Sequence, residues 1–80
     1  MYWNYRVIKQ TFHYKDMPID KEDTFTIHEV YYNKKHEITA VSVDAIAACG
    51  DKKKVLFKDL QMMQEAFLKP VLEYDKIKFH

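Results

Sequence analysis

The segment VLFKDLQMMQEAFL, residues 55–68, decides the fold. Its apolar side chains recur at intervals of four, three and four residues, at Leu56, Leu60, Met63 and Phe67. Side chains at this spacing line one face of an α-helix, and the polar residues between them fall on the other face. We therefore expect one amphipathic helix, ending at about Lys69 because Pro70 cannot continue it. Its apolar stripe should pack against the strands of the rest of the chain.

Three segments before the helix show the alternation and the aromatic and β-branched content of β-strands, namely residues 2–12, 24–32 and 37–43. The polar residues 33–36 predict a turn, so the last two strands should form an antiparallel hairpin. The charged residues 13–23 predict a solvated connection between the first two strands.

The predicted fold class is therefore α+β. We expect a three-stranded antiparallel sheet in β-β-β-α order, packed on one C-terminal helix, in a single domain over residues 1–80. Residues 71–80 contain alternating apolar side chains that allow a short fourth strand or an arm.

The second predicted strand presents apolar side chains on both of its faces. Phe25 and Ile27 fall on one face, whereas Val30 and Tyr32 fall on the other. A β-bulge near residues 28–29 would bring both pairs to one face, as suits a monomer. Without that bulge the sheet has two apolar faces, as suits a dimer.

The small apolar residues 44–50 connect the sheet to the helix. Gly50 is the only glycine of the sequence, which predicts either a positive φ or a close backbone approach at this point. Asp51 is the expected N-cap of the helix. Cys49 is the only cysteine, and its apolar surroundings predict a buried small hydrophobe, with a reactive thiol before the helix N-terminus as the alternative.

The bulk composition narrows the functional class. The formal net charge is +1, whereas a dedicated nucleic-acid binder usually has a clear basic excess. No stretch approaches the ~20 apolar residues of a membrane span, and a single cysteine suits a reducing cytoplasm. One Trp, six Tyr and five Phe are more aromatic residues than a small core holds, so we expect some to lie at an interface.

Two sets of residues are candidate sites. The aromatic strand residues and their neighbours form a candidate protein interface of Trp3, Tyr5, His28, Val30, Tyr31 and Tyr32. Three consecutive lysines at the start of the helix form a candidate anion site, Lys52, Lys53 and Lys54, in which the free backbone amides would assist. A frayed, solvated first turn is the simpler interpretation of these lysines, because cations oppose the helix dipole there.

The sequence predicts no catalytic set, no metal site and no cofactor. His28 and His36 lie too far apart along the predicted hairpin to share a metal ion, which needs ligands within ~2–2.6 Å. A single glycine excludes a glycine-rich phosphate loop.

Three segments carry a family resemblance: WNYRVI at residues 3–8, IHEVYY at 27–32 and KPVLEYD at 69–75. Together they resemble a family of short bacterial and phage-borne proteins of unassigned function. The resemblance implies a cytoplasmic bacterial or phage setting and brings no catalytic residues. The order of strands, small-residue loop and helix is also similar to HicB-type antitoxin domains, as an analogy of layout only.

The functional hypothesis from the sequence is a non-enzymatic protein-interaction module of a bacterium or phage that self-associates into a homodimer. One alternative is a nucleic-acid-binding or antitoxin-like regulator, suggested by strand aromatics beside Arg6 and Lys9. A second is a phage inhibitor of a host defence protein. A small enzyme is the least favoured, because the candidate groups are scattered along the sequence.

Overall fold

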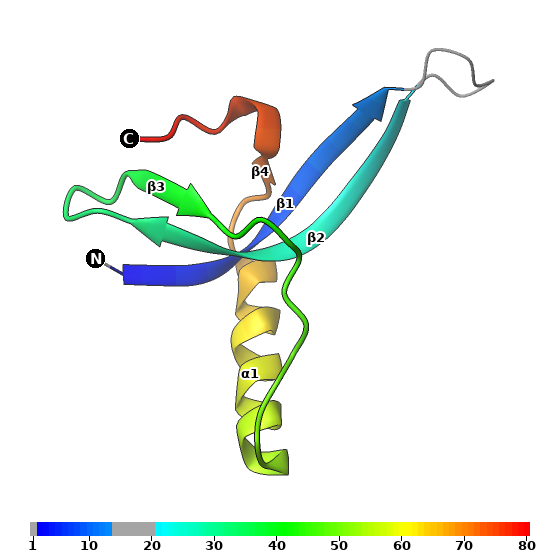
Figure 1. Ribbon diagram of the computed structural model, residues 1–80, viewed down its shortest axis with the longest axis vertical. Helices are drawn as coiled ribbons and strands as arrows, with labels where there is room; N and C mark the ends of the chain where they lie inside the picture. Colours follow the sequence, from blue (N-terminus) through cyan, green and yellow to red (C-terminus); the bar gives the residue numbers. More distant parts are fainter. Residues whose placement is uncertain (1, 14–20) are drawn as a thin grey trace.

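The computed structural model describes residues 2–13 and 21–80 and contains one sheet and one α-helix (Figure 1). Its strands and helix are β1 (Tyr2–His13), β2 (Lys21–Tyr32), β3 (Ile38–Val41), α1 (Lys53–Glu65) and β4 (Leu72–Glu73). Two short 3-10 turns, Ala66–Leu68 and Tyr74–Lys76, follow α1 and β4. The predicted α+β class and the single C-terminal helix are confirmed.

The sheet is mixed, in the order β3-β2-β1-β4, which corrects the prediction of a purely antiparallel, three-stranded sheet. The pairs β1–β2 and β2–β3 are antiparallel as expected, but β4 runs parallel to β1. The chain leaves α1 and returns along the free edge of β1 in the direction of β1, so that Leu72 pairs with Ile8 and Glu73 with Lys9.

The hairpin of β1 and β2 is longer than predicted. His13 belongs to β1 and residues 21–23 belong to β2. Both ends of the connection predicted over residues 13–23 are therefore parts of strands. Its remainder, residues 14–20, lies outside the described residues. The predicted turn at 33–36 is confirmed, because the Asn33 side chain accepts from the backbone N–H groups of Lys35 and Glu37.

The chain itself covers both faces of β2 from Ile27 to Tyr32, whereas Phe25 stays exposed. The register of β1 and β2 runs without a bulge over all the pairs described. The irregularity that occurs lies instead between β2 and β3 at Tyr31 and Tyr32, which pair with Ala40 and Ile38. Of the two alternatives, the bulge near residues 28–29 is therefore wrong, and the sheet with two apolar faces is correct.

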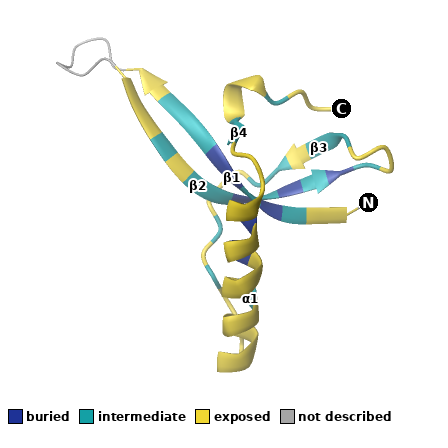
Figure 2. Ribbon diagram, turned by 180° about the vertical axis from the view of Figure 1, so that it is seen from behind, coloured by how far each residue is buried: buried dark blue, intermediate teal, exposed yellow. Residues whose placement is uncertain are grey.

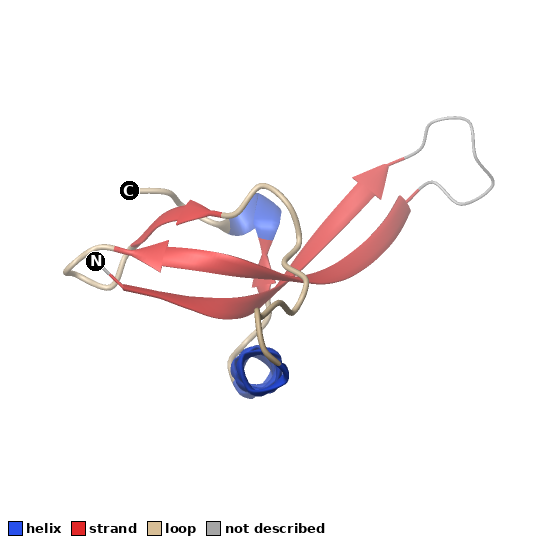
Figure 3. Cartoon of the chain, turned by 60° about the horizontal axis from the view of Figure 1, so that its bottom comes forward, coloured by secondary structure: helices blue, strands red, loops and turns tan. Residues whose placement is uncertain are grey.

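One face of the sheet meets α1, and the other meets the C-terminal segment (Figure 3). The helix-side core contains Tyr5, Val7, Met63 and Ala66, with Ile27, Ile46 and Ala48 packed against it. The opposite core contains Ile8, Val30 and Tyr32, with Ile38, Val41, Leu72 and Ile77 packed against it. The backbone N–H of His80 donates to the carbonyl oxygen of Ile38 at 2.9 Å. This hydrogen bond holds the C-terminal residue against the face that contains Ile8 and Val30.

The helix does not lie across the sheet with its stripe buried, as the sequence predicted. Only the C-terminal end of α1 packs on the sheet, and most of the helix stands away from it (Figures 1 and 2). Met63 is buried, but the other stripe residues Leu56, Leu60 and Phe67 are exposed. The face that meets the rest of the chain is the neighbouring line of Asp59, Met63 and Ala66, at a helical spacing of four and three.

Gly50 allows the connection from the sheet to pass close to the first turn of α1. A Cβ atom at this position would lie 2.4 Å from the backbone nitrogen of Leu56 and 2.9 Å from the carbonyl carbon of Val55. The φ angle of Gly50 is not positive. Of the two reasons predicted for this glycine, the close approach is therefore the correct one.

We expect Gly50→Ala to destabilise the fold by about 1–3 kcal/mol, because the added methyl group displaces backbone that cannot move independently. Urea unfolding at a fixed protein concentration measures this change. Ala47→Ser, at an exposed position of the same connection, is the matched control and should change stability by less than about 0.5 kcal/mol. Equal effects of the two substitutions would contradict the close approach at Gly50.

A second substitution tests the covering of the opposite face. Ile77→Ala removes a half-buried side chain from the cluster around Ile8 and Val30, so the free energy of unfolding should fall by about 1–2 kcal/mol. Lys78→Ala, at the exposed neighbouring position, is the control. If Ile77→Ala were as neutral as the control in urea unfolding, the C-terminal segment would not cover this face in solution.

Candidate protein-interaction surface on α1

Four of the exposed apolar side chains of α1 and of the turn after it lie on one side of the helix and are here called the α1 apolar line: Leu56, Phe57, Leu60 and Phe67. The exposed fractions of Phe57, Leu60 and Phe67 are 61%, 45% and 69%, against 6% for Met63. With 3.6 residues per turn, Leu56 and Phe67 lie within about 40° of Leu60 around the helix, and Met63 lies about 60° away on the side of the sheet. The chain thus buries one edge of the predicted stripe and leaves the rest exposed.

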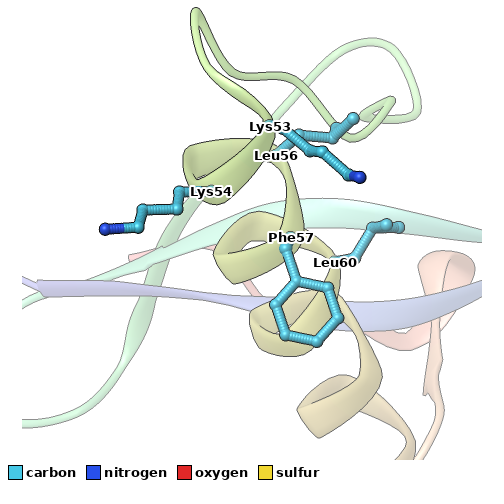
Figure 4. Close-up of a pocket in the computed structure, with 5 residues that line it drawn as sticks. All are labelled: Lys53, Lys54, Leu56, Phe57 and Leu60. Atoms are coloured by element: carbon cyan, nitrogen blue, oxygen red, sulfur yellow. The ribbon is translucent and has the colours of Figure 1, made fainter.

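A hollow of about 430 Å³ runs along the N-terminal half of this line (Figure 4). Its lining residues are Lys53, Lys54, Leu56, Phe57 and Leu60. The ring of Phe57 and the side chain of Leu60 lie on adjacent turns, and the two lysines extend away from each other above them. The hollow is therefore lined by apolar side chains and has the ammonium groups of two lysines at one end.

The opposite side of α1 is attached to the sheet through Asp59. The Tyr5 hydroxyl donates to Asp59 Oδ1 at 2.6 Å, and the Cys49 backbone N–H donates to Asp59 Oδ2 at 2.9 Å. These two hydrogen bonds, that from Tyr5 first, lower the pKa of the Asp59 carboxyl. Burial, followed by the hydrogen bond to Asp59, raises the pKa of Tyr5 well above its usual range. Both oxygens of the carboxylate are thus used to orient the helix.

The N-terminus of α1 is weakly supported. Lys52 occupies the N-cap position in place of the predicted Asp51, and within the described residues no side chain hydrogen-bonds to this end of the helix. The first turn carries no acidic residue, so the positive end of the helix dipole faces lysines. The three residues of the predicted anion site, Lys52, Lys53 and Lys54, are all exposed there, and anion binding by them stays a prediction.

The six residues of the predicted strand interface do not share one exposed surface. Trp3, Tyr5 and Tyr31 lie on the helix side of the sheet, and His28, Val30 and Tyr32 lie on the opposite side. Four of the six are buried within the chain, namely Tyr5, His28, Val30 and Tyr32. Trp3 is exposed and packs edge-on against Tyr5 with ring centroids 5.1 Å apart. Contact of Trp3 and half-buried Tyr31 with a partner stays a prediction.

The burial of His28 and Tyr32 has a structural explanation. His28 Nδ1 lies 2.9 Å from the Ser42 carbonyl oxygen and therefore carries the donated proton, and Nε2 lies 2.8 Å from the Thr26 hydroxyl. The Tyr32 hydroxyl donates to Asn4 Oδ1 at 2.9 Å and accepts from Arg6 at 3.2 Å. Both ring nitrogens of His28 and the hydroxyl of Tyr32 thus have polar partners inside the chain.

Cys49 is exposed, which corrects the prediction of a buried small hydrophobe. Residues 45–49 follow the helix as an extended segment, and Ile46 and Ala48 face the core while Cys49 faces outward. Among the residues that the structure describes, no three His, Cys, Asp or Glu side chains gather as a metal ion requires. The described part of the chain also lacks a helix with the length and apolar character needed to cross a membrane.

Comparison with protein families, with curated proteins and with solved structures finds no match for this chain. The resemblance described for the three sequence segments therefore stays a prediction.

We expect Asp59→Asn to weaken the fold at neutral pH and to have less effect in acid. Because the pKa of Asp59 is lower in the folded chain, its contribution to stability is complete above the unfolded pKa of about 4 and is lost as the pH falls through the folded pKa. The gap in unfolding free energy between wild type and variant should therefore narrow as the pH falls below about 5 and through the lowered pKa of Asp59.

Urea unfolding across this pH range measures the gap, with Asp44→Asn as the control at an exposed aspartate. A gap for Asp59→Asn that stays constant from neutral pH into acid would contradict the role of the ionised Asp59 carboxylate.

Proposed function

We propose that this chain is a small, non-enzymatic protein-interaction module that binds another protein surface through the α1 apolar line. The observation that supports the proposal is the exposure of Phe57, Leu60 and Phe67 on a helix that stands away from its own sheet. Large apolar side chains that gather on one side of an element are often covered by another surface.

The N-terminal half of α1 has few stabilising contacts within the chain, which supports the same proposal. A helix of 13 residues is marginally stable alone, and tertiary packing normally provides the difference. Here the buried contacts are made at its C-terminal end by Met63 and Ala66, whereas the first turn lacks a cap and carries lysines against the dipole. Full burial of one Leu or Phe side chain contributes about 1.5–3 kcal/mol, so a partner on the apolar line would stabilise this half of the helix.

The composition of the surface supports the proposal. Its aromatic and aliphatic residues are accompanied by polar side chains, with Lys53 and Lys54 at the N-terminal end and Gln61 and Gln64 on the turn after Leu60. Protein interfaces combine an apolar centre rich in aromatic residues with a polar rim in this way. The molecule is also extended: its radius of gyration is 14.8 Å, against roughly 12 Å for a compact domain of this length.

Site-specific photocrosslinking in bacterial cells that produce the chain tests the proposal. A benzophenone amino acid in place of Phe57 should give a discrete protein adduct upon illumination, and Leu60→Glu in the same chain should abolish it. The same amino acid in place of Phe12, an exposed phenylalanine far along β1 from the helix, is the matched control and should give no such adduct. Equal adducts at both positions, no adduct at Phe57, or an adduct unaffected by Leu60→Glu would contradict the proposed surface.

A further inference from the structure

We infer that the partner of the α1 apolar line is an acidic amphipathic peptide segment. Its large apolar side chains enter the hollow beside Phe57 and Leu60, and its carboxylates face Lys53 and Lys54. This inference rests on the proposed function, because it names the chemistry of the partner for the surface proposed there. Its support comes from the charges around α1, from the shape of the hollow and from the mixture of residues on this side of the helix.

Both charged residues that line the hollow are cationic. With 3.6 residues per turn, Lys53 lies about 20° from Leu60 around the helix, and Lys54 lies about 60° beyond Phe57. Both lysines are exposed, and they extend in different directions from the first turn of α1 (Figure 4). The positive end of the helix dipole lies at the same place. A segment in the hollow therefore meets positive charge at this end.

The carboxylates of α1 do not neutralise these two lysines. Asp59 lies on the side of the helix that faces the sheet, where its two oxygens accept the hydrogen bonds described above. Glu65 is the last residue of α1 and lies at the other end of the helix. Across the residues that the structure describes, no carboxylate forms an ion pair with Lys53 or Lys54. Their charges are therefore available to the carboxylates of a partner, and electrostatic complementarity of this kind selects an acidic one.

The hollow has the size and lining that suit apolar side chains. Its volume of about 430 Å³ lies in the range of roughly 300–1,000 Å³ that is usual for pockets that hold small organic groups. The side chains of Leu56, Phe57 and Leu60 line it and bring no hydrogen-bonding group into it. A large apolar side chain of the partner, beside its acidic residues, is therefore the group that fits.

The mixture of residues on this side of α1 favours a peptide over an anionic membrane. A helix that lies in a bilayer surface keeps its polar residues on the face opposite its apolar face. On α1, Lys53 and Gln64 lie about 20° and 40° from Leu60, between Leu60 and Phe57 around the helix. A peptide can meet these polar groups with carboxylates and amides of its own, which the acyl chains of a lipid lack.

Selection of peptides on the purified chain tests the chemistry of the partner. The probe is a library of random short peptides displayed on filamentous phage. Leu60→Gln, which removes an apolar side chain of the hollow without adding charge, is the matched target that identifies peptides bound elsewhere. Peptides that prefer the wild type should be rich in Asp and Glu beside Leu, Phe or Trp. Enrichment of basic or uncharged peptides, or no enrichment over Leu60→Gln, would overturn the inference.

Fluorescence anisotropy with a synthetic copy of an enriched peptide then tests the two lysines. Lys53→Glu combined with Lys54→Glu should weaken binding at least about tenfold, because it reverses the charge that faces the carboxylates. Acidic residues in the first turn stabilise a helix, so this loss would not be due to an unfolded α1, as far-UV circular dichroism verifies.

The matched control for this pair is Lys34→Glu combined with Lys35→Glu, the same change of charge at two adjacent exposed lysines in the 33–36 turn. This control should bind the peptide as the wild type does. An equal loss in both double variants, or no loss in the helix variant, would overturn the inference.

Flotation with vesicles of phosphatidylglycerol and phosphatidylcholine tests the other anionic surface. The chain should not float with these vesicles. Flotation of the wild type that Leu60→Gln abolishes would overturn the inference, because the apolar line would then bind a membrane.

The two proposals can fail separately. If photocrosslinking from Phe57 gives an adduct that requires Leu60 but is unaffected by the Lys53→Glu and Lys54→Glu pair, the interaction module stands and the acidic partner is wrong. If Phe57 gives no adduct and no peptide is enriched, both are wrong. An adduct that requires Leu60 and is lost on reversal of the two lysines supports both.

Discussion

The two-sided burial of β1 is the constraint on which the structure depends. Tyr5 and Val7 point to one face of the sheet and Ile8 to the other, and the register with β2 contains no bulge that would bring them together. A two-faced strand is stable only if both faces are covered. With 80 residues available, the chain uses α1 and residues 46–48 for one face and β4 with the C-terminal segment for the other.

This division of the chain explains why α1 keeps an exposed apolar line. The extended segment before the helix occupies part of the helix-side face, since Ile46 donates its backbone N–H to the carbonyl oxygen of Ile27. The helix therefore meets the sheet at Met63 and Ala66, and the hydrogen bonds of Asp59 to Tyr5 and Cys49 set its rotation. That rotation directs Leu60 and Phe67 away from the sheet. The exposed line is thus a consequence of how the molecule covers β1.

Much of this architecture could be predicted from the sequence, because periodicity reports local structure directly. Alternation located β1 and β2, the 33–36 turn is encoded by Asn33, and the helix follows from its spacing. What periodicity cannot report is which surface a stripe packs against. The 4-3-4 stripe is expected in the sheet core, yet only Met63 of its four members is buried there. The parallel β4 and the location of the strand aromatics on two faces depend on long-range packing that no local pattern encodes.

The candidate site was missed for the same reason. Tyr32 and Val30 were predicted at an interface because aromatic and β-branched strand residues favour either a core or a contact surface, and here the core contains them. The useful signal is a mismatch within the helix itself: a strong apolar stripe together with three lysines at its N-terminus. A helix of this kind is poorly supported by its own sequence and therefore depends on its contacts.

Hydroxyl-radical footprinting of α1 in the purified chain tests the central claim most directly. We predict that Met63 is protected, while Leu60 and Phe67 react with the radical. If Leu60 and Phe67 were as protected as Met63, the helix would lie flat on its own sheet, which would contradict the exposed line.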